Sequence, residues 1–96
     1  MKPSAALEKN RSAVRAAVAR YRTSNPRVFG SVARNEDTEQ SDLDILVDTL
    51  PATTLFDLGG LQADLEDLLG VRVHVVTTNG LATRFRHRIL AEARPV

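Results

Sequence analysis

The chain has 96 residues, of which 43% are hydrophobic and 26% are charged. That is enough for one folded domain and too little for a second catalytic lobe. The absence of cysteine excludes disulfides, thiolate catalysis and cysteine-based zinc sites. No window approaches the roughly 20 apolar residues of a membrane span, and the start lacks the apolar stretch of a signal peptide. We therefore expect a single domain over residues 1–96, in the cytoplasm and without membrane contact.

The formal net charge of +1 conceals three unlike segments. Residues 1–35 hold eight Lys or Arg and one acid, residues 36–70 hold ten acids and no base, and residues 71–96 hold five arginines and one acid. Binding to nucleic acid through counterion release needs a net basic surface, so we expect no direct nucleic-acid contact. The segregation indicates an acidic site flanked by cationic surfaces.

The first 30 residues predict a helix and a short strand. Apolar residues recur at helical spacing over Ser4–Tyr21, which favours one helix there. Proline disfavours helix at its own position and at the residue before it, so Thr23–Pro26 is expected to end the helix. The apolar piece Arg27–Phe29 then reads as a strand that enters a tight turn at Gly30.

The central third predicts a polar loop, a buried strand and a helix. Residues 35–41 are all polar, and Leu43–Asp48 is almost continuously apolar, as in a strand covered on both faces. Leucines keep helical spacing over Leu55–Leu69, with acids on the opposite side. Gly70 is expected to cap this helix at its C-terminal end.

The last third predicts a strand and a final helix. Val71–Thr77 places valines on one face at period two. A helix over Leu81–Ala93 is expected to bury Leu81, Phe85 and Ile89. The full order is helix, strand, strand, helix, strand, helix, which predicts an α/β or α+β sandwich with both long helices on one side of the sheet.

Two short motifs carry the chemistry. Asp42 and Asp44 stand at i and i+2 at the mouth of a predicted strand, so their side chains emerge on one face, with backbone positions roughly 7 Å apart. Oxygen ligands of this kind select hard cations such as Mg²⁺, which usually takes one or two carboxylates plus substrate phosphates. Gly30 and Ser31 add a turn whose backbone approaches a phosphate closely. Each motif alone is more often structural, whereas the pair points to a metal-dependent phosphate site.

The pair Gly30-Ser31 and Asp42-Leu43-Asp44 resembles the signature of the nucleotidyltransferase superfamily that includes DNA polymerase beta. The whole chain is similar to the minimal nucleotidyltransferases that act as antitoxins to HEPN-domain toxins. The matching segments are Gly30–Arg34, Ser41–Val47, Leu65–Gly70, Val73–Thr77 and Ile89–Ala93.

This resemblance implies a polymerase beta-like fold, with a small mixed sheet packed by helices. It implies transfer of AMP from ATP, with Mg²⁺ or Mn²⁺, to a hydroxyl, in the antitoxin branch a tyrosine of a HEPN ribonuclease toxin that also forms a complex with the antitoxin. Asp42 and Asp44 would bind the metal ions. The residues that would bind the nucleotide are Gly30, Ser31, Arg34 and Ser41.

One position departs from the family pattern. Where the family has a third carboxylate, on the strand after the leucine-rich helix, this chain has His74. An imidazole accepts a proton near neutral pH, which makes His74 a candidate catalytic base, but it is a poor magnesium ligand. Asp48 lies roughly 13 Å along the strand from Asp44, too far to share its ions. Asp37 and Glu39 lie in the loop and could approach the site, although nothing in the sequence fixes their positions.

Two alternatives stay open from the sequence. With His74 in place of an acid, the chain could be a catalytically impaired antitoxin that neutralises its toxin by binding alone. It could also be a small-molecule nucleotidyltransferase whose acceptor site is completed by a partner chain, because a domain of this size encloses little substrate.

Overall fold

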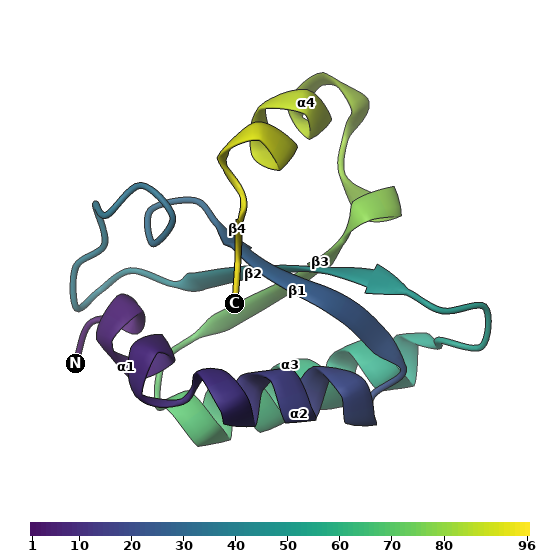
Figure 1. The fold of residues 1–96 in the computed structure, drawn as a ribbon, viewed down its shortest axis with the longest axis horizontal. Helices are drawn as coiled ribbons and strands as arrows, with labels where there is room; N and C mark the ends of the chain where they lie inside the picture. The colour runs from purple at the N-terminus through teal and green to yellow at the C-terminus, as the bar shows by residue number, and fades with distance from the viewer.

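A computed structural model describes all residues 1–96 as four α-helices and a four-stranded sheet (Figure 1). The elements are α1 (Pro3–Lys9), α2 (Arg11–Arg20), β1 (Thr23–Phe29), β2 (Leu43–Thr49), α3 (Leu55–Leu69), β3 (Val73–Thr77), the 3₁₀ turn η1 (Thr78–Gly80), α4 (Thr83–Glu92) and β4 (Arg94–Pro95). The strand order is β3-β2-β1-β4. Strands β2 and β3 run parallel, and β1 is antiparallel to both β2 and β4, so the mixed α/β fold expected from the sequence is confirmed.

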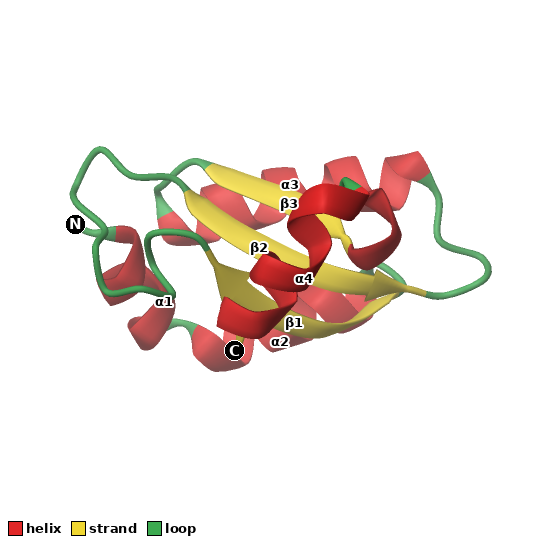
Figure 2. Ribbon diagram, turned by 90° about the horizontal axis from the view of Figure 1, so that it is seen from above, coloured by secondary structure: helices red, strands yellow, loops and turns green.

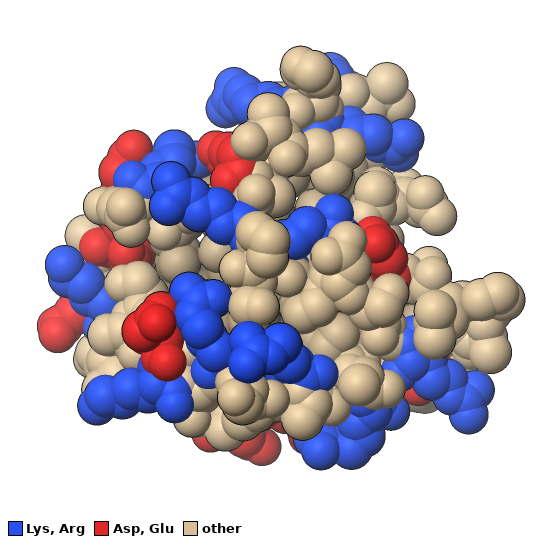
Figure 3. All heavy atoms as spheres, in the orientation of Figure 1, with Lys and Arg blue, Asp and Glu red and all other residues tan.

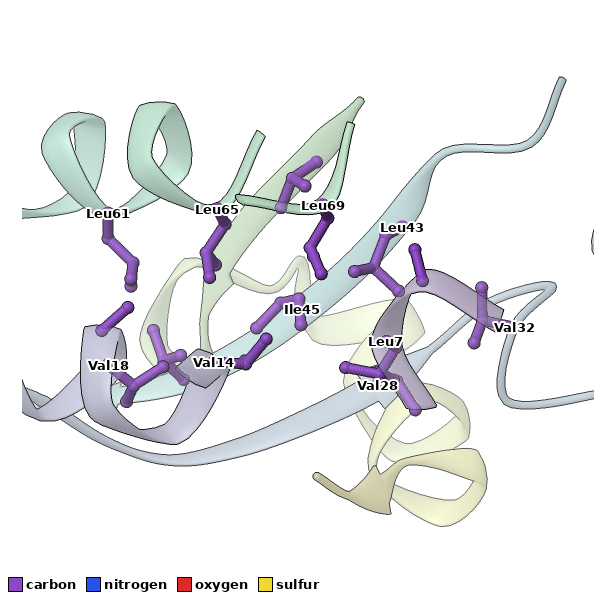
Figure 4. Packing of buried hydrophobic residues seen from close by; sticks show 14 of the residues in the cluster. Leu7, Val14, Val18, Val28, Val32, Leu43, Ile45, Leu61, Leu65 and Leu69 are labelled. Atoms are coloured by element: carbon purple, nitrogen blue, oxygen red, sulfur yellow. The ribbon is translucent and has the colours of Figure 1, made fainter. Parts of the chain in front are cut away.

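The hydrophobic core lies between the sheet and helices α2 and α3, which cover the same face (Figures 1 and 4). Leucines from α3 point toward Val14 and Val18 of α2 and toward β2. Strand β2 is covered on both faces, because Leu43, Ile45, Leu46 and Val47 are all fully buried. The packing of both long helices on one side, predicted from the sequence, is therefore confirmed.

Helix α3 has the predicted limits, and its ends show why. Thr54 and Asp57 exchange hydrogen bonds in a capping box at the start, and Gly70 closes the end with a left-handed φ of 68°. Gly60 lies directly under the Tyr21 ring, where a Cβ atom would come within 2.6 Å of a ring carbon. Tyr21 in turn donates a 2.6 Å hydrogen bond to Asp64, so the acidic face of α3 is not only solvated but also ties α3 to the end of α2.

The prediction of one helix over residues 4–21 is wrong at its middle. Asn10 leaves helical geometry at φ −129°, and its side-chain amide donates to the carbonyl of Ala6. Asparagine competes in this way for backbone carbonyls, so the chain forms two helices that meet at Asn10.

The first strand is longer than predicted, because Thr23–Pro26 joins it. Arg22 reverses the chain with a φ of 59°, and Thr23 donates its hydroxyl to the carbonyl of Val18. The pairing with β2 shifts register between Ser24 and Arg27, so Pro26 sits at a bulge, where a strand tolerates proline.

The C-terminal region departs most from the prediction. The third strand begins at Val73, two residues later than expected, and η1 delays α4 to Thr83. Helix α4 lies on the sheet face opposite α2 and α3 and crosses the strands there (Figure 2). It has no buried residue, and of the three side chains expected to be buried only Leu81, which precedes α4, is. Phe85 is 43% exposed because this face of the sheet presents polar side chains such as Asp44 and Asp48.

No helix here has both the length and the apolar content that spanning a membrane requires.

Candidate active site

The predicted site residues meet at one end of the sheet, where β1 ends and β2 begins. In the pairing registers Asp44 lies between Phe29 of β1 and His74 of β3. Gly30 follows Phe29 directly, so the Gly-Ser turn stands beside Asp44 although 14 residues separate them. The sheet therefore brings together the two motifs that the sequence keeps apart.

Asp42 is held by two basic side chains of the β3 segment. Its Oδ2 is 2.8 Å from Nε2 of His74, and its Oδ1 is 2.9 Å from Nε of Arg72. The hydrogen bond with His74, helped by the charge of Arg72, holds the pKa of Asp42 below its usual value. Oδ1 is a buried oxygen whose one polar contact is this ion pair with Arg72.

Asp44 is half-buried, and no side chain or amide hydrogen-bonds to it. Burial raises the pKa of this carboxyl, and neighbouring Asp42 and Glu92 add to the effect against the nearby cations. A Cβ atom on Gly30 would overlap Oδ2 of Asp44. Glycine is therefore needed here on two counts, the contact with Asp44 and a φ of 71°.

The turn after Gly30 leaves several donors unused. Residues 30–35 form turns in which the amides of Arg34, Asn35 and Glu36 donate backward, whereas those of Ser31, Val32 and Ala33 find no backbone acceptor. Ser31 is only partly exposed. Such free amides beside a serine hydroxyl suit the oxygens of a phosphate.

Glu92 is a site residue that the sequence analysis missed. This side chain, the last of α4, accepts a 3.0 Å hydrogen bond from the Gly30 amide and contacts Nη1 of Arg34 with both oxygens, at 3.1 and 3.3 Å. The hydrogen bond from Gly30, together with Arg34, outweighs burial and holds the pKa of Glu92 below its usual value. The available signal was its position as the single acid among five arginines in residues 71–96.

Other predicted candidates lie elsewhere. Ser41 closes a turn in the loop, where its hydroxyl accepts from the Thr38 amide. Asp37 is buried and accepts from the Ser4 amide at the start of α1, and Glu39 lies 3.8 Å from the terminal amine of Met1. Neither therefore supplies the missing third acid. Asp48 lies at the far end of β2, as expected, and bonds to other residues there.

The carboxylates fit a hard divalent cation. Asp44 has no hydrogen-bond partner in the protein and has lone pairs available, whereas Asp42 would share its oxygens between a cation and the side chains of Arg72 and His74. No group of three or more His or acidic side chains forms a complete metal cage. Magnesium commonly takes one or two carboxylates and fills its other positions with water and substrate phosphates, so two aspartates are enough protein ligands for it.

Charge is less segregated around this site than the segments of the sequence suggested. Figure 3 shows Lys and Arg atoms over α4 at the top and across the lower part of the molecule, with acids in smaller groups. The basic side chains are not all remote from the acids, because Arg34 and Arg72 contact Glu92 and Asp42 directly.

Sequence comparison places residues 12–96 in the family described as nucleotidyltransferase domain. The chain is 47% identical over 66 residues to MJ0435, a candidate protein adenylyltransferase of Methanocaldococcus jannaschii, which covers 69% of this chain and 71% of that protein. It is 42% identical over 65 residues to the protein adenylyltransferase MntA of Thermococcus cleftensis, covering 68% of this chain and 66% of MntA.

Solved structures agree on the fold. A structure of a candidate minimal nucleotidyltransferase superposes with a TM-score of 0.89 at 47% identity, over 100% of this chain and 97% of that one. A toxin-antitoxin structure with AMP-PNP superposes with a TM-score of 0.77 at 17% identity, over 90% of this chain and 71% of that one, which is a likeness of fold. The paired aspartates, the Gly-Ser turn and these matches together show that the chain belongs to the nucleotidyltransferase family and is a nucleotidyltransferase.

Proposed function

We propose that this protein, as a single domain of residues 1–96, transfers AMP from ATP to a hydroxyl group of a partner protein in a reaction that depends on Mg²⁺ or Mn²⁺. The partner is a HEPN ribonuclease toxin, and the acceptor is a tyrosine. Its relatives named as protein adenylyltransferases and its structural neighbours from toxin-antitoxin complexes support this choice of reaction and partner.

The observation that carries the proposal is the state of Asp44. A half-buried carboxylate without a hydrogen bond is unfavourable in the free protein, and a cation beside it would remove that cost. Asp42, directly before β2 and ion-paired to Arg72 through Oδ1, would be the second ligand. Divalent cations at this position supply charge neutralisation and alignment of the attacking and leaving oxygens in phosphoryl transfer.

His74 is the residue that accepts the proton of the attacking hydroxyl. Carboxylate oxygens only accept hydrogen bonds, so Nε2, which faces Asp42, carries the hydrogen and Nδ1 is the free acceptor. The ring is 57% exposed, which lets an acceptor hydroxyl reach it. Asp42 fixes the ring, and Nδ1 takes the proton as the hydroxyl oxygen attacks the α-phosphorus of ATP. The bond from the α-phosphorus to the oxygen that bridges to the β-phosphate breaks, and pyrophosphate leaves.

The triphosphate lies along the Gly30 turn. The amide and hydroxyl of Ser31, the amide of Gly30 and the guanidinium of Arg34 are the donors that hold its oxygens. Ser41 stays a predicted nucleotide contact. In this structure its hydroxyl accepts a hydrogen bond from the Thr38 amide instead. The exposed arginines of α2 and α4 are available to an acidic surface of the partner.

The test uses the protein with the product of the neighbouring gene, ATP, and Mg²⁺ or Mn²⁺. Intact mass spectrometry is expected to show adenylyl groups on the partner, and peptide mapping is expected to place them on tyrosine. Asp44→Asn is expected to abolish the gain. Asp48→Asn, which makes the same change four residues along the strand, is the matched control and should keep it.

If the partner is neutralised but gains no mass with either metal, the proposed transfer is wrong. The protein would then be an antitoxin that acts by binding alone. Modification of small nucleotide acceptors, with the partner protein unmodified, would instead support the small-molecule nucleotidyltransferase.

A further inference from the structure

The carboxylate of Glu92 sits on donors that the proposed function assigns to the triphosphate. The Gly30 amide donates to its Oε1 at 3.0 Å, and Nη1 of Arg34 contacts both of its oxygens. A backbone amide and a guanidinium form a common arrangement for an oxyanion, whether carboxylate or phosphate. In the free protein, this arrangement is filled by a side chain of the chain itself.

The two anions cannot use these donors together. The Gly30 amide has one hydrogen, and a phosphate placed beside Glu92 would add a like charge within a few ångströms of it. Asp44 already crowds the same glycine from the other side, since its Oδ2 packs where a Cβ atom would be. A triphosphate with its metal ion therefore gains these donors only when Glu92 leaves them.

The packing of α4 lets Glu92 leave without unfolding the domain. No residue of α4 is buried, so few contacts oppose a tilt of the helix or a change of side-chain rotamer. Strand β4 follows at Arg94 and stays paired with β1, which keeps the C-terminal segment in place. Arg88, one turn earlier on α4, is at the spacing that suits an alternative ion pair with Glu92.

We propose that Glu92 is an internal occupant of the phosphate site, which competes with the triphosphate and links nucleotide binding to release of the last turn of α4. The inference rests on the proposed function, because it takes Gly30 and Arg34 as triphosphate donors. Only molecules in which Glu92 has left Gly30 can bind the nucleotide with all donors. The apparent affinity for nucleotide is therefore lower than the intrinsic one, in proportion to the fraction of such molecules.

The test measures binding of Mg-ATP and of Mg-tripolyphosphate by calorimetry to three proteins. These are the wild type, Glu92→Gln and the matched control Glu36→Gln. Glu36 also neighbours Arg34, with Oε1 3.5 Å from Nε, but no contact with Gly30 is formed. Glu92→Gln is expected to bind both probes at least about fivefold more tightly, and Glu36→Gln to change binding less than about twofold. Glu92→Ala provides a second variant with the same expected direction.

A second readout needs no catalysis. Adding Mg-tripolyphosphate to the wild type is expected to shift the Gly30 amide resonance and to speed hydrogen exchange in the last turn of α4. Equal or weaker binding by both Glu92 variants would overturn the role of Glu92, and it would leave the proposed function intact if the wild type binds ATP. If Glu36→Gln binds the probes as much more tightly as Glu92→Gln does, the gain comes from the loss of any negative charge near Arg34. That result would also overturn the role of Glu92. If no variant binds either probe, both the inference and the proposed nucleotide site fall.

Discussion

Strand β2 carries two aspartates that share a face of the sheet and differ in almost everything else. Asp48 accepts hydrogen bonds from Thr78, Asn25 and Arg27, at 2.7, 3.0 and 2.7 Å. Asp44, four residues earlier, accepts none and is half-buried. The pKa of Asp48 is lowered, first by the Thr78 hydrogen bond, whereas burial raises the pKa of Asp44.

The contrast separates a carboxylate that the fold uses for its own hydrogen bonds from one that it leaves without any. The fold supplies every partner that Asp48 needs, and it uses this residue to join β1, β2 and η1. It supplies none to Asp44, although the sheet buries that residue more deeply. A charge that the fold leaves unpaired at this cost indicates a partner from outside the chain.

The largest expected effect comes from Asp44→Asn. Nucleotidyl transfer should fall by more than about 100-fold, because the proposed ligand of the activating cation is lost. The melting temperature without metal should stay equal to that of the wild type or rise, because the unpaired charge is removed. A clear loss of stability would contradict the comparison, since it would mean that the fold depends on this carboxylate. Adenylyl transfer and thermal denaturation of the same preparation measure both quantities.

Asp48→Asn should show the reverse behaviour. The substitution weakens three hydrogen bonds and leaves the guanidinium of Arg27, whose side chain is only 14% exposed, without its counter-charge. Because Asp48 itself is 41% exposed, solvent screens the pair and the expected loss is about 1 kcal/mol. For a domain of this size that lowers the melting temperature by about 4–8 °C. Transfer below the melting temperature should be retained, and a large loss of activity would break the distinction.

The smallest effect is in the pH dependence of stability. The lowered pKa of Asp48 gives stability that is present above its unfolded pKa and is lost as pH falls through its folded pKa. The raised pKa of Asp44 works with the opposite sign, because its stabilising protonated form is lost as pH rises through the folded pKa. The free energy of unfolding can be measured by urea denaturation in the acid range, at about pH 4. Its rise with pH should be steeper in Asp44→Asn than in the wild type, and shallower in Asp48→Asn. Parallel profiles in both variants would contradict the assignment.

Local sequence patterns were enough to predict the elements with a regular apolar repeat or a clear cap. The buried run Leu43–Asp48, the leucines of α3 and the cap at Gly70 each depend on neighbours within a few residues, and the structure confirms them. The resemblance to the family put His74 at the position of the third carboxylate, and the structure finds it 2.8 Å from Asp42. Their roles in the reaction stay predictions.

The errors concern contacts between distant parts of the chain. The break at Asn10 depends on a side-chain hydrogen bond that competes with the helix, and the bulge at Pro26 depends on the partner strand. Helix α4 has an amphipathic pattern but meets a polar sheet face, so its apolar side stays exposed. Glu92 reaches Gly30 across 62 residues, a contact that only the arrangement of β1, α4 and β4 creates.

Strand β3 is one of the two edge strands of the sheet, and His74 lies on it with an exposed ring. The one cavity of the molecule, about 130 Å³, lies between α1, β1 and β4, and neither aspartate of the site nor His74 lines it. The approach to the proposed base is therefore open from the side of the sheet and has no enclosing wall. Such an approach admits a bulky polypeptide as easily as a small molecule. Under the proposed function, discrimination among hydroxyl groups would therefore depend on how the partner docks beside β3 rather than on the fit of a closed pocket.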